Sequence, residues 1–293
     1  MQDHFFNSAR GDFHWLDFGG QGPLTHIAHA TGFCARTYAP LAARLHDYLH
    51  IIGMDDRGHG RTTAQADPRR IKDWGLFADD MEAFFEHLGR PVIAMGHSRG
   101  GVASLLLAVR RPNLVRAVIL IDPTIIPFSW GWWWALMKKT GMGQRIPIAA
   151  KAAKRRWVWQ ERQDVYDSYA GRGIFKNWTD GFLEGYLADG LVEDDKGRVR
   201  LSCLPEWESR VFATCNHDLW RYIPRLTQPV LVLYGRKSDT FLPPAINRFR
   251  RVCPDTVFVG LEDTSHFVPM ERPDETAAII LKFLGDHKLL DID

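Results

Sequence analysis

Short apolar runs alternate with amphipathic segments along most of the chain. Six runs are almost wholly apolar: 24–29, 49–54, 91–96, 115–123, 229–235 and 256–261. Between them lie segments with apolar residues three or four positions apart: 38–48, 74–88, 102–110, 245–252 and 273–284. A short apolar run predicts a strand buried on both faces, and a 3.6-residue period predicts a helix. An alternating segment at 13–18, next to the turn-forming residues 19–23, predicts an early antiparallel hairpin.

This alternation predicts a mostly parallel, doubly wound α/β sheet that helices cover on both faces. The pattern is interrupted once, because residues 124–212 contain no convincing parallel strand and yet hold eight of the eleven tryptophans. We therefore expect one sheet domain, formed by residues 1–123 and 213–293, with a helical, Trp-rich cap inserted at 124–212.

Composition narrows the classes of function. The chain has 293 residues, 45% of them hydrophobic, a formal net charge of +2, and four cysteines with no Cys-x-x-Cys pair. The small net charge predicts no nucleic-acid partner, and the scattered cysteines predict neither a metal site nor a disulfide framework. The first residues lack the basic and apolar regions of a signal peptide, and no apolar stretch reaches the roughly 18 residues of a membrane span. We expect a cytoplasmic protein.

Residues 96–100 read Gly-His-Ser-Arg-Gly and lie directly between an apolar run and a helical pattern. A serine on a sharp strand-to-helix turn has strained backbone geometry, and its neighbours two positions away need to lack side chains. Gly96 and Gly100 meet this need. The N-terminus of the following helix also directs backbone amides toward negative charge that forms beside Ser98. The pattern therefore predicts that Ser98 is a nucleophile.

A serine nucleophile needs a base, and the base needs an orienting acid. His266 follows the last predicted strand and is the candidate base. Two aspartates follow earlier predicted strands, and the carboxyl ends of parallel strands lie at one edge of a sheet. We favour Asp239, just past the run 229–235, as the acid. Asp122, at the end of the run 115–123, is the alternative.

The order of Ser98, Asp239 and His266 across alternating strands and helices resembles the α/β-hydrolase superfamily. The likeness is to its serine esterase and lipase branch with a helical cap, and it covers nearly the whole chain. Residues 96–101 are similar to the nucleophile elbow of that family, and residues 55–60, Asp-Asp-Arg-Gly-His-Gly, to its turn after an earlier strand.

The resemblance implies further features of the site. The oxyanion hole would consist of the amides of Phe33 and Arg99, and the reaction would need neither a metal nor an organic cofactor. Relatives that open epoxides or remove halide have aspartate where this chain has Ser98, which argues against both activities.

The three candidate residues predict hydrolysis of a small hydrophobic carboxylic ester through an acyl-enzyme. One alternative is a carbon–carbon bond hydrolase of the meta-cleavage type, which the same residues would serve. Another is a non-catalytic, ligand-binding relative that uses the capped pocket as a receptor. An intact set of three polar residues favours the enzyme, because a receptor needs none of them.

The cap sequence suggests what the protein binds. Residues 129–137 are too aromatic for an ordinary solvated loop, so we expect Trp130, Trp133 and Trp134, together with Phe267 beside the candidate base, to line an apolar pocket. The alternative is that the tryptophans simply pack the cap against the core. Basic residues interleaved with tryptophan further along suit a membrane surface or an anionic acyl carrier, and a solvated helix face is the alternative. The sequence does not indicate whether the protein is a monomer or an oligomer.

Overall fold

The structure is a computed structural model that describes residues 1–290. Its larger sheet has eight strands in the order β1-β2-β4-β3-β5-β6-β10-β11. These strands are β1 (Gln2–Ser8), β2 (Gly11–Gly19), β3 (Leu24–Ala28), β4 (His50–Met54), β5 (Val92–His97), β6 (Val115–Ile121), β10 (Val230–Gly235) and β11 (Val257–Leu261). The six apolar runs are β3, β4, β5, β6, β10 and β11, so the predicted strands are confirmed.

The six strands from β4 to β11 pair in parallel, and β2 runs against them. β1 is antiparallel to β2 and therefore has the direction of the six. The predicted hairpin exists, but it joins β1 to β2 around Gly11 and not around residues 19–23. β2 ends at Gly19, where that second turn begins, and it pairs with β4. The strand after the turn, β3, lies on the far side of β4, so residues 19–23 close no hairpin. The expected fold class, a mostly parallel α/β sheet, is confirmed.

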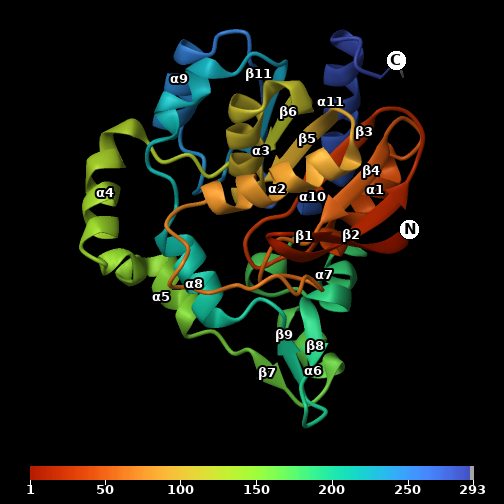
Figure 1. Ribbon diagram of the computed structural model, residues 1–293, viewed down its shortest axis with the longest axis vertical. Helices are drawn as coiled ribbons and strands as arrows, with labels where there is room; N and C mark the ends of the chain where they lie inside the picture. Colours follow the sequence, from red (N-terminus) through yellow and green to blue (C-terminus); the bar gives the residue numbers. More distant parts are fainter. Residues whose placement is uncertain (291–293) are drawn as a thin grey trace.

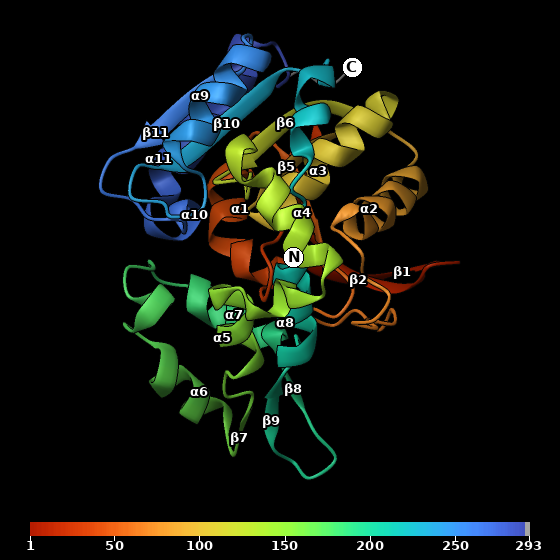
Figure 2. The ribbon, with the colours of Figure 1, turned by 90° about the vertical axis from the view of Figure 1, so that its left-hand side faces the viewer.

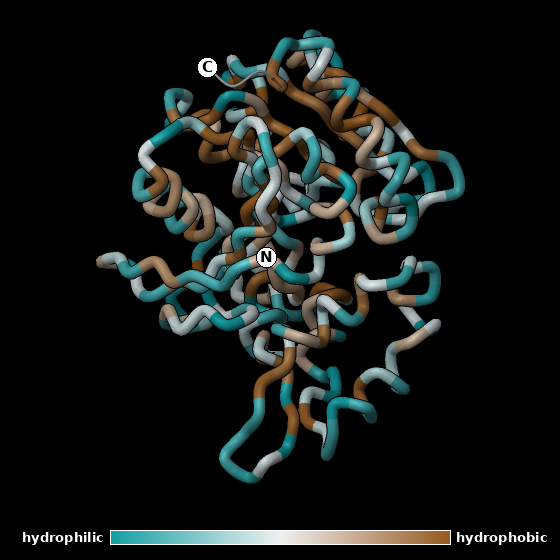
Figure 3. The backbone as a smooth tube through the Cα atoms, turned by 90° about the vertical axis from the view of Figure 1, so that its right-hand side faces the viewer, coloured by the Kyte–Doolittle hydropathy of each residue, from teal (hydrophilic) through white to brown (hydrophobic). Residues whose placement is uncertain are grey.

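Helices cover both faces of this sheet, as Figure 1 shows. The helices of the sheet domain are α1 (Ala39–Leu45), α2 (Gly75–Leu88), α3 (Arg99–Arg110), α9 (Pro243–Val252), α10 (Val268–Glu271) and α11 (Pro273–Asp286). One buried cluster contains apolar residues of α2, α3 and α9, and the other contains those of α1 and α11. Alternate residues of each central strand divide between them: Val232 of β10 belongs to the first cluster, and Leu231 and Leu233 belong to the second. This division is what a doubly wound sheet requires. In Figure 3 the most hydrophobic stretches accordingly run through the sheet domain.

The segment between β6 and β10 forms the cap below and beside the sheet domain (Figures 1 and 2). Its helices are α4 (Gly131–Lys139), α5 (Pro147–Ala153), α6 (Arg162–Tyr169), α7 (Phe182–Gly190) and α8 (Pro205–Ala213). It also contains a small antiparallel sheet of β7 (Val158–Trp159), β8 (Leu191–Glu193) and β9 (Val199–Leu201). The sequence did not indicate this small sheet, since strands of two or three residues leave no readable alternation.

Within residues 1–290, no helix is both long enough and apolar enough to cross a lipid bilayer.

Candidate active site

Ser98 lies on the turn between β5 and α3 and has a φ of +57°, in a region that residues other than glycine rarely adopt. Its amide donates to the carbonyl of Ile121 at the end of β6, 3.0 Å away, which ties the turn to the neighbouring strand. A Cβ at position 96 would overlap the backbone of Gly100, and one at position 100 would overlap the carbonyl of Ala28. The glycine requirement predicted for this turn thus has a direct steric cause.

His266 lies in the loop between β11 and α10, and its Nδ1 is 2.8 Å from Oδ1 of Asp122. The Asp122 carboxylate is completely buried. It also accepts hydrogen bonds from the Ser238 hydroxyl at 2.6 Å and from the Gly235 amide at 2.9 Å. These fixed donors hold the carboxylate toward the imidazole. The structure therefore pairs His266 with Asp122, the alternative acid.

The prediction that Asp239 pairs with His266 is contradicted by this geometry. Asp239 is exposed, and the hydrogen bond found for its carboxylate comes from the hydroxyl of the adjacent Thr240, at 3.3 Å. The reason is the turn after β10, which directs Ser238 inward and leaves the next side chain in solvent. Strand order alone could not separate the two aspartates, because β6 and β10 are neighbours and both end at the same edge of the sheet.

The Ser98 hydroxyl lies 3.1 Å from the hydroxyl of Thr124, two residues beyond Asp122. No hydrogen bond joins Ser98 to His266 in the described part of the chain, and the His266 side chain keeps 15% of its surface exposed. Active-site hydrogen bonds that are loose without substrate commonly tighten once it binds. Sequence reasoning missed Thr124, whose position becomes evident only when the path of the chain after β6 is known.

The expected oxyanion hole is only half supported. Arg99 begins α3, and its amide has no backbone acceptor among residues 1–290. The amide of Phe33, however, already donates to the carbonyl of Ala30 at 3.2 Å, so the prediction for Phe33 is wrong in this structure. The cause is a tight turn with Gly32 at a φ of +83°. Thr31, inside that turn, keeps an amide with no backbone acceptor in the described chain.

The side chain of Arg99 holds this turn against the nucleophile elbow. It is fully buried, its Nε donates to the Thr31 hydroxyl at 3.1 Å, and its Nη2 donates to the carbonyl of His29 at 3.3 Å. An ion pair with Asp56 at 2.7 Å compensates its charge. Burial lowers the pKa of His29 beside it, so this imidazole stays neutral and accepts from the Asp56 amide at 2.9 Å.

His97, next to Ser98, connects the remaining parts of the site. The Tyr38 hydroxyl accepts from the Ala30 amide at 3.1 Å and lies 2.8 Å from Nδ1 of His97. The other ring nitrogen lies 2.9 Å from the carbonyl of His266. Burial lowers the pKa of His97 well below its usual value, so the ring is neutral. It then accepts from Tyr38 and donates to His266, because a neutral imidazole has one donor and one acceptor.

Aromatic side chains surround the candidate base. The ring of Phe267 lies 5.3 Å from that of His266 and 5.9 Å from that of Trp178, and Trp178 contacts Phe33 edge-on at 5.3 Å. The expectation that Phe267 lies at the site is consistent with this placement. Trp178 and the side chain of Phe33 were not anticipated, since nothing in the local sequence around either residue marks it.

The other three expected pocket residues lie elsewhere. Trp130 and Trp133 of the α4 region are 51% and 40% exposed. Trp134 packs against a small cluster of Ile146, Ala149 and Ala213 within the cap. Of these three residues, Trp134 fits the alternative that the tryptophans pack the cap against the core, since it also packs against the larger core cluster. Trp130 and Trp133 are exposed.

One group of side chains in the described chain has the spacing of a metal site: His14, Asp55 and Asp189. Both ring nitrogens of His14 are already engaged, by Asp55 at 2.7 Å and by Asp3 at 2.9 Å. Asp189 pairs with Arg36. These bonds make the group an ion-pair network that joins the cap to the first strands, and it offers no free ligand atom on the histidine.

A strained serine at a strand-to-helix turn, with a buried aspartate–histidine pair beside it, defines a hydrolase class of active site on a doubly wound sheet. The chain belongs to the alpha/beta hydrolase family, whose model matches residues 27–279.

Two curated relatives match almost their full length. The chain is 26% identical to haloalkane dehalogenase 2 of Mycobacterium tuberculosis, over 97% of this chain and 96% of that protein. It is also 26% identical to 2-(acetamidomethylene)succinate hydrolase of Mesorhizobium japonicum, over 96% of both proteins. A crystal structure of E-2-(acetamidomethylene)succinate hydrolase superposes with a TM-score of 0.81 at 23% identity, covering 97% of this chain and 99% of that one. This last likeness shows the shared fold.

Proposed function

We propose that this hydrolase is a serine carboxylesterase with Ser98 as nucleophile, His266 as base and Asp122 as acid. The observation that carries the proposal is the 2.8 Å contact between His266 and the buried Asp122, at the sheet edge where Ser98 leaves β5. Asp122 accepts the Nδ1 proton of His266, which leaves Nε2 as the acceptor for a proton from serine.

In the proposed reaction, the Ser98 hydroxyl exchanges its contact with Thr124 for one with Nε2 of His266. The oxygen attacks the ester carbonyl as the proton passes to the imidazole, and a tetrahedral oxyanion forms. The amides of Thr31 and Arg99 stabilise it, and such a donor typically contributes about 3 kcal/mol to the transition state. His266 then protonates the leaving alcohol and activates water, which releases the acid and restores Ser98.

The surroundings of the site favour an apolar acyl group. Phe33, Trp178 and Phe267 form its aromatic wall. Two cationic groups lie next to the Thr31–Phe33 turn. Arg99 is paired with Asp56. Arg155 lies beside Gly32, but its Nη1 lies within 3.0 Å of both carboxylate oxygens of Glu208 and its Nη2 donates to the Tyr169 hydroxyl at 2.9 Å. A guanidinium so engaged is not free to bind a substrate carboxylate. This distinguishes the proposed substrate from the succinate derivative in the relative's name.

Dehalogenation does not suit Ser98. A carboxylate that displaces halide forms an ester, which water can cleave at the carbonyl. A serine hydroxyl would form an ether without a carbonyl, and the enzyme would stop after one turnover. From the similarity to haloalkane dehalogenase 2 we therefore infer a shared fold and family, and we do not propose its activity for this chain.

The test is labelling by a fluorophosphonate probe, which reacts with activated serines, followed by hydrolysis of nitrophenyl esters of increasing acyl length. We expect rapid labelling that Ser98→Ala abolishes, and hydrolysis that rises from acetate to medium-length chains. Absence of Ser98-dependent labelling would support the ligand-binding alternative and refute the enzyme. Labelling without ester hydrolysis would direct attention to the carbon–carbon alternative. The cytoplasmic location stays a prediction.

A further inference from the structure

Helix α4 is apolar in sequence and yet contributes no buried residue. Large apolar side chains of α4, of the turn before it and of α5 are exposed, among them Trp132 at 71% and Phe128 at 58%. We call these residues the α4 patch: Phe128, Trp130, Trp132, Trp133, Leu136 and Ile148. Figure 1 shows α4 at the left-hand edge of the molecule. Large apolar side chains exposed together on one helix and the segments next to it are typical of an interaction site.

The charge around the patch has one sign. Residues 124–160 contain no aspartate or glutamate and seven basic residues: Lys138, Lys139, Arg145, Lys151, Lys154, Arg155 and Arg156. Since the whole chain carries +2, the other residues together carry −5. Of the seven, Arg155 pairs with Glu208. Five are exposed and have no carboxylate partner within residues 1–290: Lys139, Arg145, Lys151, Lys154 and Arg156.

The apolar and basic residues share a face of α4. Trp132, Leu136 and Lys139 are four and then three positions apart, so they align along one side of the helix. Tryptophan prefers the boundary between water and lipid, where its ring meets the acyl region and its N–H the headgroups. A lysine at the helix end extends its charge to the headgroup level. This is the composition of a helix that lies in a membrane surface.

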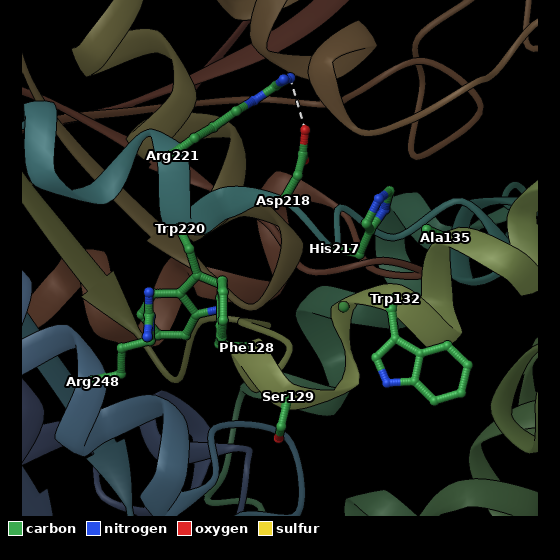
Figure 4. Close-up of a pocket in the computed structure, with 10 residues that line it drawn as sticks. Phe128, Ser129, Trp132, Ala135, His217, Asp218, Trp220, Arg221 and Arg248 are labelled. Carbon is green, nitrogen blue, oxygen red and sulfur yellow. Dashed lines mark ion pairs between the residues drawn. The ribbon is translucent and has the colours of Figure 1, made fainter.

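A groove of about 620 Å³ extends the patch toward α9. Phe128 and Trp132 line it together with Trp220 and Arg248, as Figure 4 shows. The Arg248 guanidinium lies over the Phe128 ring, 3.8 Å from its centre. The only carboxylate in the lining, Asp218, is already paired with Arg221 at 2.7 Å. The groove thus continues both the apolar character and the positive charge of the patch.

We propose that the α4 patch and the basic residues around it dock on the surface of an anionic lipid bilayer. An acidic protein would also attract the cations, but it would not account for indole rings exposed on a convex helix. A bilayer accounts for both, because the rings enter its interface while unpaired cations neutralise its phosphates. The docking needs no turnover, so it stands or falls independently of the esterase proposal.

The experiment is sedimentation of the full chain with phosphatidylcholine vesicles, with and without phosphatidylglycerol. We expect binding only to the anionic vesicles, and release at about 1 M salt, where charges are screened beyond about 3 Å. Lys139→Gln combined with Lys151→Gln should weaken partitioning about 30-fold, since each cation near an anionic surface contributes about a factor of five. Trp132→Ser combined with Trp133→Ser should also weaken it, with an unchanged circular dichroism spectrum.

The matched control is Arg90→Gln combined with Lys196→Gln, which removes two exposed cations from other parts of the surface. It should bind vesicles like the parent chain. An equal loss of binding in this control would reduce the effect to net charge and overturn the proposal. Binding to neutral and anionic vesicles alike, no vesicle binding at all, or binding to an acidic acyl carrier protein in place of vesicles would each overturn it as well.

Discussion

Replacing Asp122 by asparagine tests the assignment of the acid most sharply. The backbone at Asp122 has a φ of +42°, and asparagine tolerates such a conformation as well as aspartate does. Asparagine also has the same shape, so the fold should persist. Only the charge and one acceptor are lost, which isolates the chemistry from the packing.

The structure determines how the new amide would be oriented. The Gly235 amide faces Oδ2, and a backbone N–H can only donate, so the side-chain oxygen of asparagine must take that position. The NH₂ group then replaces Oδ1 and faces Nδ1 of His266. The imidazole must accept there and carry its proton on Nε2, where it cannot take the proton of Ser98. In a serine triad this wrong tautomer lowers kcat by about 10⁴, or about 5 kcal/mol.

The assay compares rates of fluorophosphonate labelling and of nitrophenyl ester hydrolysis in Asp122→Asn and Asp239→Asn. Because Asp239 is exposed, its replacement should change either rate by no more than about twofold. Unfolding by urea controls for stability. If Asp239→Asn lost activity and Asp122→Asn kept it, the assignment from this geometry would be refuted.

Three further predictions concern the elbow, the resting contact of the nucleophile and acid stability. Gly100→Ala places a methyl group against the carbonyl of Ala28 and should lower the free energy of unfolding by 1–3 kcal/mol or more, measured in urea. Thr124→Val removes the hydroxyl that lies 3.1 Å from the Ser98 hydroxyl. Fluorophosphonate labelling should become about fivefold faster, which corresponds to the loss of one net hydrogen bond of about 1 kcal/mol. Slower labelling would show that the Thr124 hydroxyl assists the reaction. Burial lowers the pKa of His26 from 6.5 to about 4, so the unfolded chain binds more protons than the folded chain between these pH values. The free energy of unfolding should therefore fall by up to about 3 kcal/mol as the pH drops from 6.5 to 4. In His26→Gln this fall should be smaller.

The elements that the sequence predicts well are those whose cause is local. The central apolar runs became strands that are buried on both faces, such as β3, β5 and β10, and nearly every residue of these runs is apolar for that reason. The last run became β11 at the edge of the sheet, where it is only partly buried. Ser98 could be recognised because the steric conditions of its turn involve residues only two positions away. His266 was found because it follows the last strand, a position that depends on strand order and not on detailed packing.

The features that escaped prediction depend on side chains distant in sequence. Phe33 lost its expected role because a turn at Gly32 commits its amide to Ala30, and the sequence does not show that turn type. Trp130 and Trp133 were expected to line the pocket. The apolar character of a residue predicts that its side chain is buried, but it does not show which other residues cover it. The structure leaves them in solvent.

The identity of the acid shows how small a structural difference decides a functional residue. β6 and β10 are adjacent and parallel, with Leu233 paired to Ile121, so an aspartate after either strand begins within reach of the same loop. What separates them is one hydrogen bond: the Gly235 amide at the end of β10 donates to Asp122 and not to a residue of its own turn. With the Ser238 hydroxyl on the other oxygen, the end of β10 provides the donors that fix the acid at the end of β6. Ser238→Ala should therefore slow the reaction through Asp122, and Asp239→Asn should not, although the two residues are neighbours in sequence.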